Sequence, residues 1–321
     1  MIVVLTTPSH DYTHRVLEDN GRFELRRMTY ERVLTRRRLP RATYVFTDLD
    51  RLNFWELQLA ARLYAWLRRA GLKVLNDPAR VRQRFSLLRT LNDNGFNGFD
   101  AWRIEDPRRP ARAHYPVFLR TEGAHRGNLT DLLETPEALE AAIEQALERG
   151  IPARDLIAIQ YCARPLRPGL FRKLAAFRVG DRMVTSLAVH ESRWTAKHGE
   201  TGIASAEDYA DEHASIRDNG YGELLRPAFE AARVEYGRVD FGLVDGRPQV
   251  YEINTNPNIK RMTSHPVALR IESARMFDVA LIDAFTVLDT PTGGAPVLVD
   301  DEALGQQRIH DRWLLKARWI P

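Results

Sequence analysis

The residues most suggestive of chemistry are two carboxylates and an amide in a pair of β-type segments. Residues 238–244 and 249–254 flank a short Asp-Gly turn, which is the pattern of a β-hairpin. Side chains alternate between the two faces of a strand, so Glu252 and Asn254 lie on one face. A three-residue loop between the strands predicts that Asp240 lies directly opposite Glu252, with Cβ atoms roughly 4.5–5.5 Å apart.

Two carboxylates this close repel each other unless a cation lies between them. Oxygen ligands from Asp, Glu and Asn, without His or Cys, suit Mg²⁺. Asp240, Glu252 and Asn254 are therefore a candidate magnesium site, and the polar turn at 255–258 can add donors. The alternative is an amphipathic hairpin whose polar face meets solvent. If the site is real, replacing Glu252 with Gln relieves a repulsion in the metal-free protein.

An α/β unit is expected at the N-terminal end of the chain. Residues 2–6 and 43–47 are short β-type runs. A capping box at Asn53 starts a helix, and residues 73–75 form the next expected strand. This β-α-β order predicts a small α/β domain over residues 1–75.

Helices and short strands also alternate through the rest of the chain. Asp77 and Pro78 predict the start of a helix that runs to about Asn94. The other expected elements are strands at 116–120 and 156–161, a helix from Thr135, a hairpin over 174–189 and a helix over 267–288. The segment from Thr290 is rich in Pro and Gly and then charged, which predicts a linker and tail.

The segment RVDFGLVDGRPQVYEINTNPNI, residues 238–259, closely resembles the metal-binding end of ATP-grasp enzymes. In that family an Asp on one strand and a Glu-x-Asn on the next hold the magnesium ions that bridge the ATP phosphates. The resemblance thus implies that Asp240, Glu252 and Asn254 are metal ligands. It covers about residues 76–290 and is strongest in the last third. It implies an α/β (α+β) ATP-grasp fold with a pre-ATP-grasp domain at 1–75, an ATP-grasp domain at 76–290 and a linker and tail at 291–321.

The resemblance also implies which residues contact ATP. The two phosphate-binding lysines of the family correspond to Arg84 and Arg120, so this chain departs from the lysine pattern. Arg84 lies on the apolar stripe of its expected helix, where it needs an ATP phosphate or an internal carboxylate as partner. The phosphate-covering loop corresponds to 121–128, where Gly123 and Gly127 let backbone amides approach phosphate. The adenine-contacting linker corresponds to Gln160, Tyr161 and Cys162.

The resemblance implies basic groups near the γ-phosphate and the substrate, and these correspond to Lys173 and Lys197. Surface cations at strand ends are the alternative for both lysines. His190 and His198 lie in the same part of the chain and are candidate acid–base residues, although a single His is more often structural.

The composition is that of an ordinary globular chain of 321 residues with a net charge of +4. Its single cysteine, Cys162, excludes an internal disulfide framework and a Cys-based zinc site, and a buried apolar role suits it. The N-terminal apolar run is too short for a signal peptide, and no run approaches the roughly 20 apolar residues of a membrane span. We therefore expect a soluble, cytoplasmic protein without membrane contact. The arginines of residues 26–41 fit a solvated surface or an anionic partner such as nucleic acid.

The chemistry implied by the resemblance is ATP- and Mg²⁺-dependent ligation. A small-molecule or peptide carboxylate attacks the γ-phosphate to give an acylphosphate, which an amine or similar nucleophile then attacks. One alternative keeps the fold but makes the protein a kinase of small hydroxylated molecules. Another is a non-catalytic nucleotide-binding module with a basic surface for nucleic acid or protein. No motif identifies the acyl substrate, the nucleophile or the oligomeric state.

Overall fold

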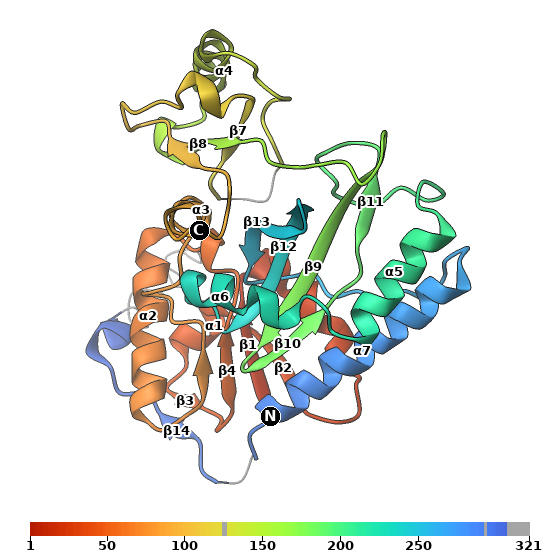
Figure 1. Ribbon diagram of the computed structural model, residues 1–321. Helices are drawn as coiled ribbons and strands as arrows, with labels where there is room; N and C mark the ends of the chain where they lie inside the picture. The colour runs from red at the N-terminus through yellow and green to blue at the C-terminus, as the bar shows by residue number, and fades with distance from the viewer. Residues whose placement is uncertain (124–126, 292–293, 307–321) are drawn as a thin grey trace, which may run out of the picture.

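The structure is a computed structural model that describes residues 1–123, 127–291 and 294–306. The described residues have a mixed α/β fold built on one parallel sheet, two larger antiparallel sheets and one two-stranded antiparallel sheet (Figure 1). The element order is the one that the ATP-grasp resemblance predicts: an α/β unit, a small antiparallel lobe, and a larger antiparallel sheet that ends in the acidic hairpin.

The N-terminal unit contains a parallel sheet with the strand order β2-β1-β4-β5. Its strands are β1 (Ile2–Thr6), β2 (Leu25–Thr29), β4 (Thr43–Phe46) and β5 (Val74–Leu75), and its helices are α1 (Tyr30–Thr35), α2 (Phe54–Arg69) and the 3₁₀ helices η1 (Pro8–Leu17) and η2 (Leu49–Arg51). The predicted capping box of α2 is confirmed at Asn53 and Glu56. Because the strands are parallel, the carboxyl ends of β1 and β4 lie side by side at one edge of the sheet.

Both faces of this sheet are buried, which explains why β1 is a continuous apolar run. Val3 and Leu5 pack in the core that contains α1 and α2. Ile2 and Val4 pack on the other face, in a core shared with α7 and the larger antiparallel sheet. The N-terminal unit is therefore joined to the rest of the chain by a continuous apolar core rather than by a linker.

The small lobe is the three-stranded antiparallel sheet β6-β8-β7, shown in yellow to light green at the top of Figure 1. Its elements are β6 (Ala101–Arg103), β7 (Val117–Thr121), β8 (Leu156–Gln160), α4 (Pro136–Glu148), η3 (Arg112–His114) and η4 (Ala153–Asp155). Alternate residues of β7 and β8 divide between two cores. One core contains α4, and the other contains residues of α3 (Arg84–Asp93), which lies between this lobe and the larger sheet.

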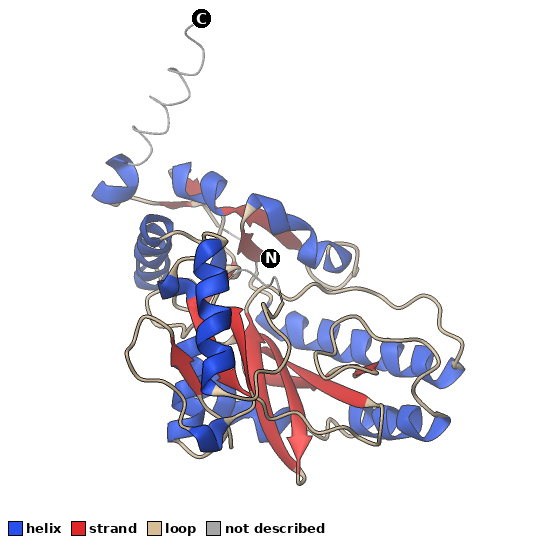
Figure 2. Ribbon diagram, turned by 90° about the horizontal axis from the view of Figure 1, so that it is seen from above, coloured by secondary structure: helices blue, strands red, loops and turns tan. Residues whose placement is uncertain are grey.

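The larger sheet has the order β10-β9-β12-β13, and β11 also pairs with β9. Its strands are β9 (Phe171–Val179), β10 (Arg182–Thr185), β11 (Val189–Glu191), β12 (Tyr236–Val244) and β13 (Arg247–Asn254), accompanied by α5 (Ala206–Arg217), α6 (Gly222–Ala232) and α7 (Ala268–Leu288). Figure 2 shows helices on both sides of the sheets. Residues of α6 share a core with one face of the larger sheet, and residues of α7 share a core with the other face.

The helix expected from Asp77 begins later, at Arg84, so that prediction was wrong. Asp77 instead closes a single turn, in which its side chain accepts a hydrogen bond from Ala79 N at 3.0 Å. Arg82 N then donates to the carbonyl of Ala232 at 3.0 Å, a tertiary bond that draws the chain out of helical geometry. Arg84 is therefore the first residue of α3 rather than a residue in its middle.

The expected C-terminal linker and tail contains structure in its described part. β14 (Val297–Leu298) pairs antiparallel with β3 (Arg38–Leu39), and Leu304 is completely buried. Arg62 also forms an ion pair with Asp301 at 3.1 Å. Residues 294–306 thus pack on the N-terminal unit, while 292–293 and 307–321 of the predicted tail lie outside the described residues. Within the described part of the chain, no helix combines the length and the apolar character needed to cross a bilayer.

Candidate functional site

The acidic hairpin has the predicted pairing, although its loop differs from the expected one. Asp245 and Gly246 form a two-residue turn with φ angles of +51° and +74°, the conformation of a tight hairpin turn. The expected three-residue loop was therefore wrong. A β-bulge at Tyr251 inserts one extra residue and restores the register, so that Asp240 lies opposite Glu252.

Two cations hold the Asp240 carboxylate, which is almost completely buried. The guanidinium of Arg238 forms a fork on it, with Nε 2.8 Å from Oδ1 and Nη2 3.2 Å from Oδ2. Lys173 on β9 places its Nζ 3.3 Å from Oδ2. One of the two lysines implied by the family resemblance therefore lies beside a predicted metal ligand.

Arg84 forms an ion pair with Glu252. A residue predicted to bind phosphate is therefore in contact with a residue predicted to bind the metal. The Arg84 side chain is only 7% exposed, and its Nη1 also donates to the carbonyl of Glu122 at 2.7 Å. Asn254, at the end of β13, accepts a hydrogen bond from Asn256 N at 2.8 Å. Of the two partners considered for Arg84, the internal carboxylate is present, and this carboxylate is itself a predicted metal ligand.

Arg120 lies close enough to Arg84 and Glu252 to interact with both charges. Burial lowers the pKa of Arg120 to about 10, with a further lowering from Arg84 that Glu252 opposes. In the described part of the chain, the buried Nε atoms of Arg84 and Arg120 have no hydrogen-bond partner. Two adjacent cations with unsatisfied donors favour an anionic ligand with several acceptor oxygens.

A cavity of about 640 Å³ opens beside this ion pair. It lies between the N-terminal unit, the start of α3, the end of β7 and the end of β13. Its polar wall includes Asp50, Arg51, Arg84, Glu122, Glu252 and Asn254. The volume suits a nucleotide-sized or similar ligand.

The charges around the acidic pair decide which ligands fit. Four cations surround two carboxylates, which leaves a surplus of two positive charges; the cations are Arg84, Arg120, Lys173 and Arg238. Among the described residues, no three His, Cys, Asp or Glu side chains are grouped to hold a metal ion. A bare cation therefore fits poorly, but Mg²⁺ that arrives with phosphate oxygens fits, because the phosphate supplies the missing negative charge and ligands.

The three residues implied for adenine binding are not among those that line the cavity, and they contact other protein groups. Gln160 Oε1 accepts from Asp100 N at 3.2 Å. The ring of Tyr161 packs edge-on against Trp194, with centroids 5.5 Å apart. Cys162 lies 3.7 Å from Gln249 Oε1, and burial raises the pKa of its thiol, which fits the structural role considered for it. An adenine role for this segment stays a prediction.

The predicted phosphate-covering loop is described at its two ends, and residues 124–126 lie outside the described residues. Gly123 lines the cavity. Gly127 has a φ of +89°, which favours glycine. Lys197 Nζ lies 4.0 Å from the place where a Cβ on Gly127 would be. Lys197 therefore lies against this loop, and its catalytic role stays a prediction.

Of the two candidate acid–base histidines, His190 is unsuited to that role. Its ring is buried near Tyr209, with ring centroids 6.0 Å apart. Burial, with Arg270 as the next cause, lowers the pKa of His190 to about 4, so the ring is neutral near pH 7. The His198 backbone N–H donates to the carboxylate of Glu191, as do the N–H groups of Lys197 and Gly199.

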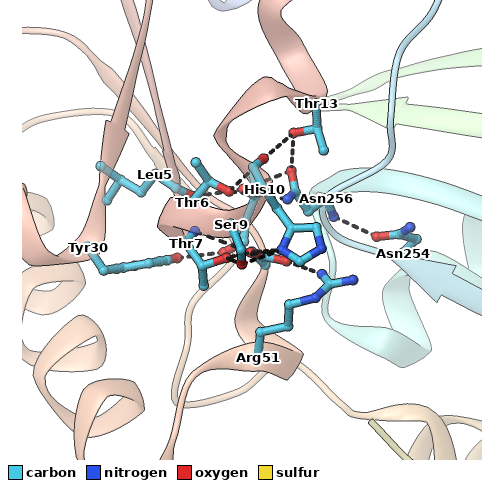
Figure 3. Close-up of polar contacts among 12 residues, drawn as sticks. Leu5, Thr6, Thr7, Ser9, His10, Thr13, Tyr30, Arg51, Asn254 and Asn256 are labelled. Carbon is cyan, nitrogen blue, oxygen red and sulfur yellow. Dashed lines mark hydrogen bonds and ion pairs between the residues drawn. The ribbon is translucent and has the colours of Figure 1, made fainter. Parts of the chain in front are cut away.

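A polar cluster that was not predicted from the sequence lies at the carboxyl ends of β1 and β4 (Figure 3). Asp48 accepts hydrogen bonds from the Thr7 backbone N–H at 3.2 Å and from the Thr7 hydroxyl, and it pairs with Arg51. His10 Nδ1 lies 3.8 Å from Asp48 Oδ2. The sequence did contain a signal for this cluster, because polar residues directly follow two β-type runs. A parallel sheet brings the carboxyl ends of such strands together, and ligands often bind there.

No known protein-family model matches the chain, and no curated protein is similar to it in sequence. Among solved structures, the chain is similar to the D-alanine–D-alanine ligase from Bacillus anthracis complexed with ATP, at 12% identity and a TM-score of 0.49, over 89% of this chain and 98% of that one. It is similar to carboxyaminoimidazole ribonucleotide synthase from Aspergillus clavatus complexed with ATP, at 14% identity and a TM-score of 0.49, over 90% and 78%. It is also similar to a RimK domain ATP-grasp protein from Sphaerobacter thermophilus, at 16% identity and a TM-score of 0.47, over 90% and 100%.

Proposed function

We propose that this protein is an ATP- and Mg²⁺-dependent ligase of the ATP-grasp type. It activates a substrate carboxylate as an acylphosphate, which an amine or similar nucleophile then attacks. The observation that carries the proposal is a pair of largely buried arginines, Arg84 and Arg120, beside the Asp240–Glu252 pair; the buried Nε atom of each has no hydrogen-bond partner among the described residues. We also propose the division into a pre-ATP-grasp domain at 1–75 and an ATP-grasp domain at 76–290.

The arginines and the acidic pair have complementary roles in this proposal. Arg84 and Arg120 bind phosphate oxygens with their guanidinium forks. When ATP enters, its negative charge releases Glu252 from Arg84, so that Glu252, Asp240 and Asn254 can hold Mg²⁺. When bound there, Mg²⁺ would neutralise phosphate charge. The backbone at Gly123 covers the phosphates from the loop side.

The reaction itself needs mainly positioning and charge compensation. A carboxylate oxygen attacks the γ-phosphorus, a new O–P bond forms, and the bond to ADP breaks. The nucleophile then attacks the carbonyl carbon, and inorganic phosphate leaves. We propose that Lys173 and Lys197 stabilise the transferring phosphoryl group. Lys173 is 20% exposed and already lies beside Asp240.

The experiment incubates the protein with ATP, Mg²⁺ and a pool of small metabolites and peptides, and identifies ATP-dependent products by mass spectrometry. A ligase yields ADP, inorganic phosphate and a condensed product. ADP together with a phosphorylated product, and no condensed product, would instead select the kinase. If neither a condensed nor a phosphorylated product forms, both the ligase and the kinase proposals are contradicted. The Asp240→Asn variant is the negative control, because it removes a charge that the proposed metal needs.

A further inference from the structure

The polar cluster at the carboxyl ends of β1 and β4 centres on His10. The chain kinks at this residue, between two short helical turns of η1. Ser9 Oγ lies 2.8 Å from His10 Nδ1, and Thr7 Oγ1 lies 3.4 Å from it. Asp48 Oδ2 lies on the same side at 3.8 Å. These three groups gather at Nδ1, and the carboxylate, which can only accept, favours the tautomer with its proton there.

The other ring nitrogen of His10 is available to a ligand. Among the residues that the structure describes, the ring contacts of His10 are all made by Nδ1, and the side chain is 27% exposed. His14, four residues later, shows the structural alternative. It is completely buried, and its two nitrogens contact Thr13 and Tyr236. His10 therefore has one anchored nitrogen and one accessible nitrogen, as an acid–base residue requires.

Asp48 is held in a way that serves this arrangement. It is completely buried and has a φ of +59°, in the left-handed region that non-glycine residues rarely adopt. Its carboxylate accepts from Thr7 through Oδ2, the oxygen nearer His10, and pairs with Arg51 through Oδ1. The strained backbone therefore aims one buried carboxylate at both a histidine and an arginine, and such strain concentrates at functional sites.

The cluster adjoins the proposed ATP site. Arg51 lines the same cavity as Glu252 and Asn254. Asn256 connects the two sites, because its backbone N–H donates to Asn254 Oδ1 and its side chain bonds Thr6 and Thr13. In Figure 3 the His10 ring lies between the side chains of Arg51 and Asn256. The cluster thus lies next to the acidic hairpin, and Arg51 extends it to the cavity.

We propose that His10 is the general base that prepares the attacking amine, and that Asp48 positions its ring. This inference rests on the proposed ligase function. In the second step the amine nitrogen forms a bond to the acyl carbon and gives one proton to His10 Nε2. The acyl C–O bond breaks, its electron pair leaves on inorganic phosphate, and the imidazolium returns the proton to water. Phosphorylation of the carboxylate, the first step, does not use His10.

The test separates the two steps by changing the nucleophile. Hydroxylamine is a strong, uncharged nucleophile near pH 7, so it converts an acylphosphate to a hydroxamate without a prepared base. The metabolite and peptide pool is incubated with ATP and Mg²⁺, with and without hydroxylamine, for the parent protein and for the His10→Ala and His10→Gln variants. His213→Asn, on α5, is the matched control for loss of a partly buried histidine. Thermal unfolding checks that each variant is folded.

For both His10 variants we expect hydroxamate formation within about threefold of the parent, and native condensation at least about 100-fold slower, the usual contribution of a general base. Added imidazole should restore part of the condensation rate to His10→Ala, which a purely structural role would not allow. Loss of both products, loss of neither, or a rate that imidazole does not raise overturns the assignment of His10. A parent protein that forms neither product overturns the proposed function itself, and this inference with it.

Discussion

Replacing Glu252 with Gln should separate the two roles of this carboxylate. From the sequence alone, the change relieves a repulsion with Asp240. The structure reverses that expectation, because Glu252 pairs with the buried Arg84 and opposes the effect of Arg84 on the pKa of Arg120. Removing the negative charge of Glu252 leaves the positive charges of Arg84 and Arg120 less neutralised. The ligand-free variant should therefore be less stable than the parent.

The size of the loss follows from the contact. A hydrogen bond to a charged group contributes about 1.5–3 kcal/mol, and the glutamine amide keeps part of it. Glu252 is also 21% exposed, so water compensates some of the lost charge. We expect a loss of about 1–2 kcal/mol in the free energy of unfolding. Turnover should fall by at least roughly 100-fold, because one electrostatic stabiliser of the phosphoryl transfer is gone.

Thermal unfolding with and without ATP and Mg²⁺, together with ADP release, measures both effects. The parent should gain stability from the nucleotide and metal, whereas the Glu252→Gln variant should gain little. Glu223→Gln is the control, because Glu223 forms an ion pair with Arg226 on the exposed surface. An ATP-dependent shift as large as that of the parent would show that Glu252 does not hold the metal. A higher melting temperature without ligand would refute the charge argument.

Three further predictions concern the same charges and the buried network beside them. Arg120→Met should raise the melting temperature without ligand, since it removes a buried like charge, and should shrink the shift caused by ATP and Mg²⁺; a lower melting temperature would contradict the first part. Calorimetric titration with Mg²⁺ alone should give no binding heat, whereas titration with ATP and Mg²⁺ together should give binding heat. Tight binding of Mg²⁺ alone would contradict the argument that the site has a surplus of positive charge. Burial lowers the pKa of His14 to about 3 from 6.5, so between these values the unfolded state binds the proton, and the free energy of unfolding falls as the pH falls. His14→Gln should flatten that dependence by up to about 1.4 kcal/mol per pH unit, which denaturant unfolding at several pH values measures.

The hairpin could be predicted because its information is local. Strand alternation places Glu252 and Asn254 on one face, and an Asp-Gly turn limits the loop to two or three residues. The loop assumed was one residue too long, and the bulge at Tyr251 supplies that residue elsewhere. The pairing of Asp240 with Glu252 was therefore right, although the assumed path of the backbone was wrong.

The errors and omissions come from contacts between distant parts of the chain. The start of α3 depends on Arg82 N, which bonds to Ala232 about 150 residues away. The fork of Arg238 on Asp240 follows from spacing of two residues along one strand and could have been predicted. The approach of Lys173 depends on β9 pairing with β12, which periodicity does not specify.

The cluster around His10 shows the same limit. Its members belong to segments about 40 residues apart, joined only when β1 and β4 pair in parallel. The residues after each strand are visible in the sequence, but their meeting requires the strand order. If the carboxyl ends of all expected parallel strands are assumed to lie at one edge of a sheet, Thr7, His10 and Asp48 are predicted to lie together.

The fate of one oxygen atom tests carboxylate activation most directly. The substrate that the pool experiment identifies is prepared with ¹⁸O in its carboxylate and converted with ATP and Mg²⁺. Formation of an acylphosphate moves one carboxylate oxygen to phosphorus, so the account predicts one ¹⁸O atom in the inorganic phosphate for each product molecule. Inorganic phosphate without ¹⁸O, in a reaction that still consumes ATP, would contradict it.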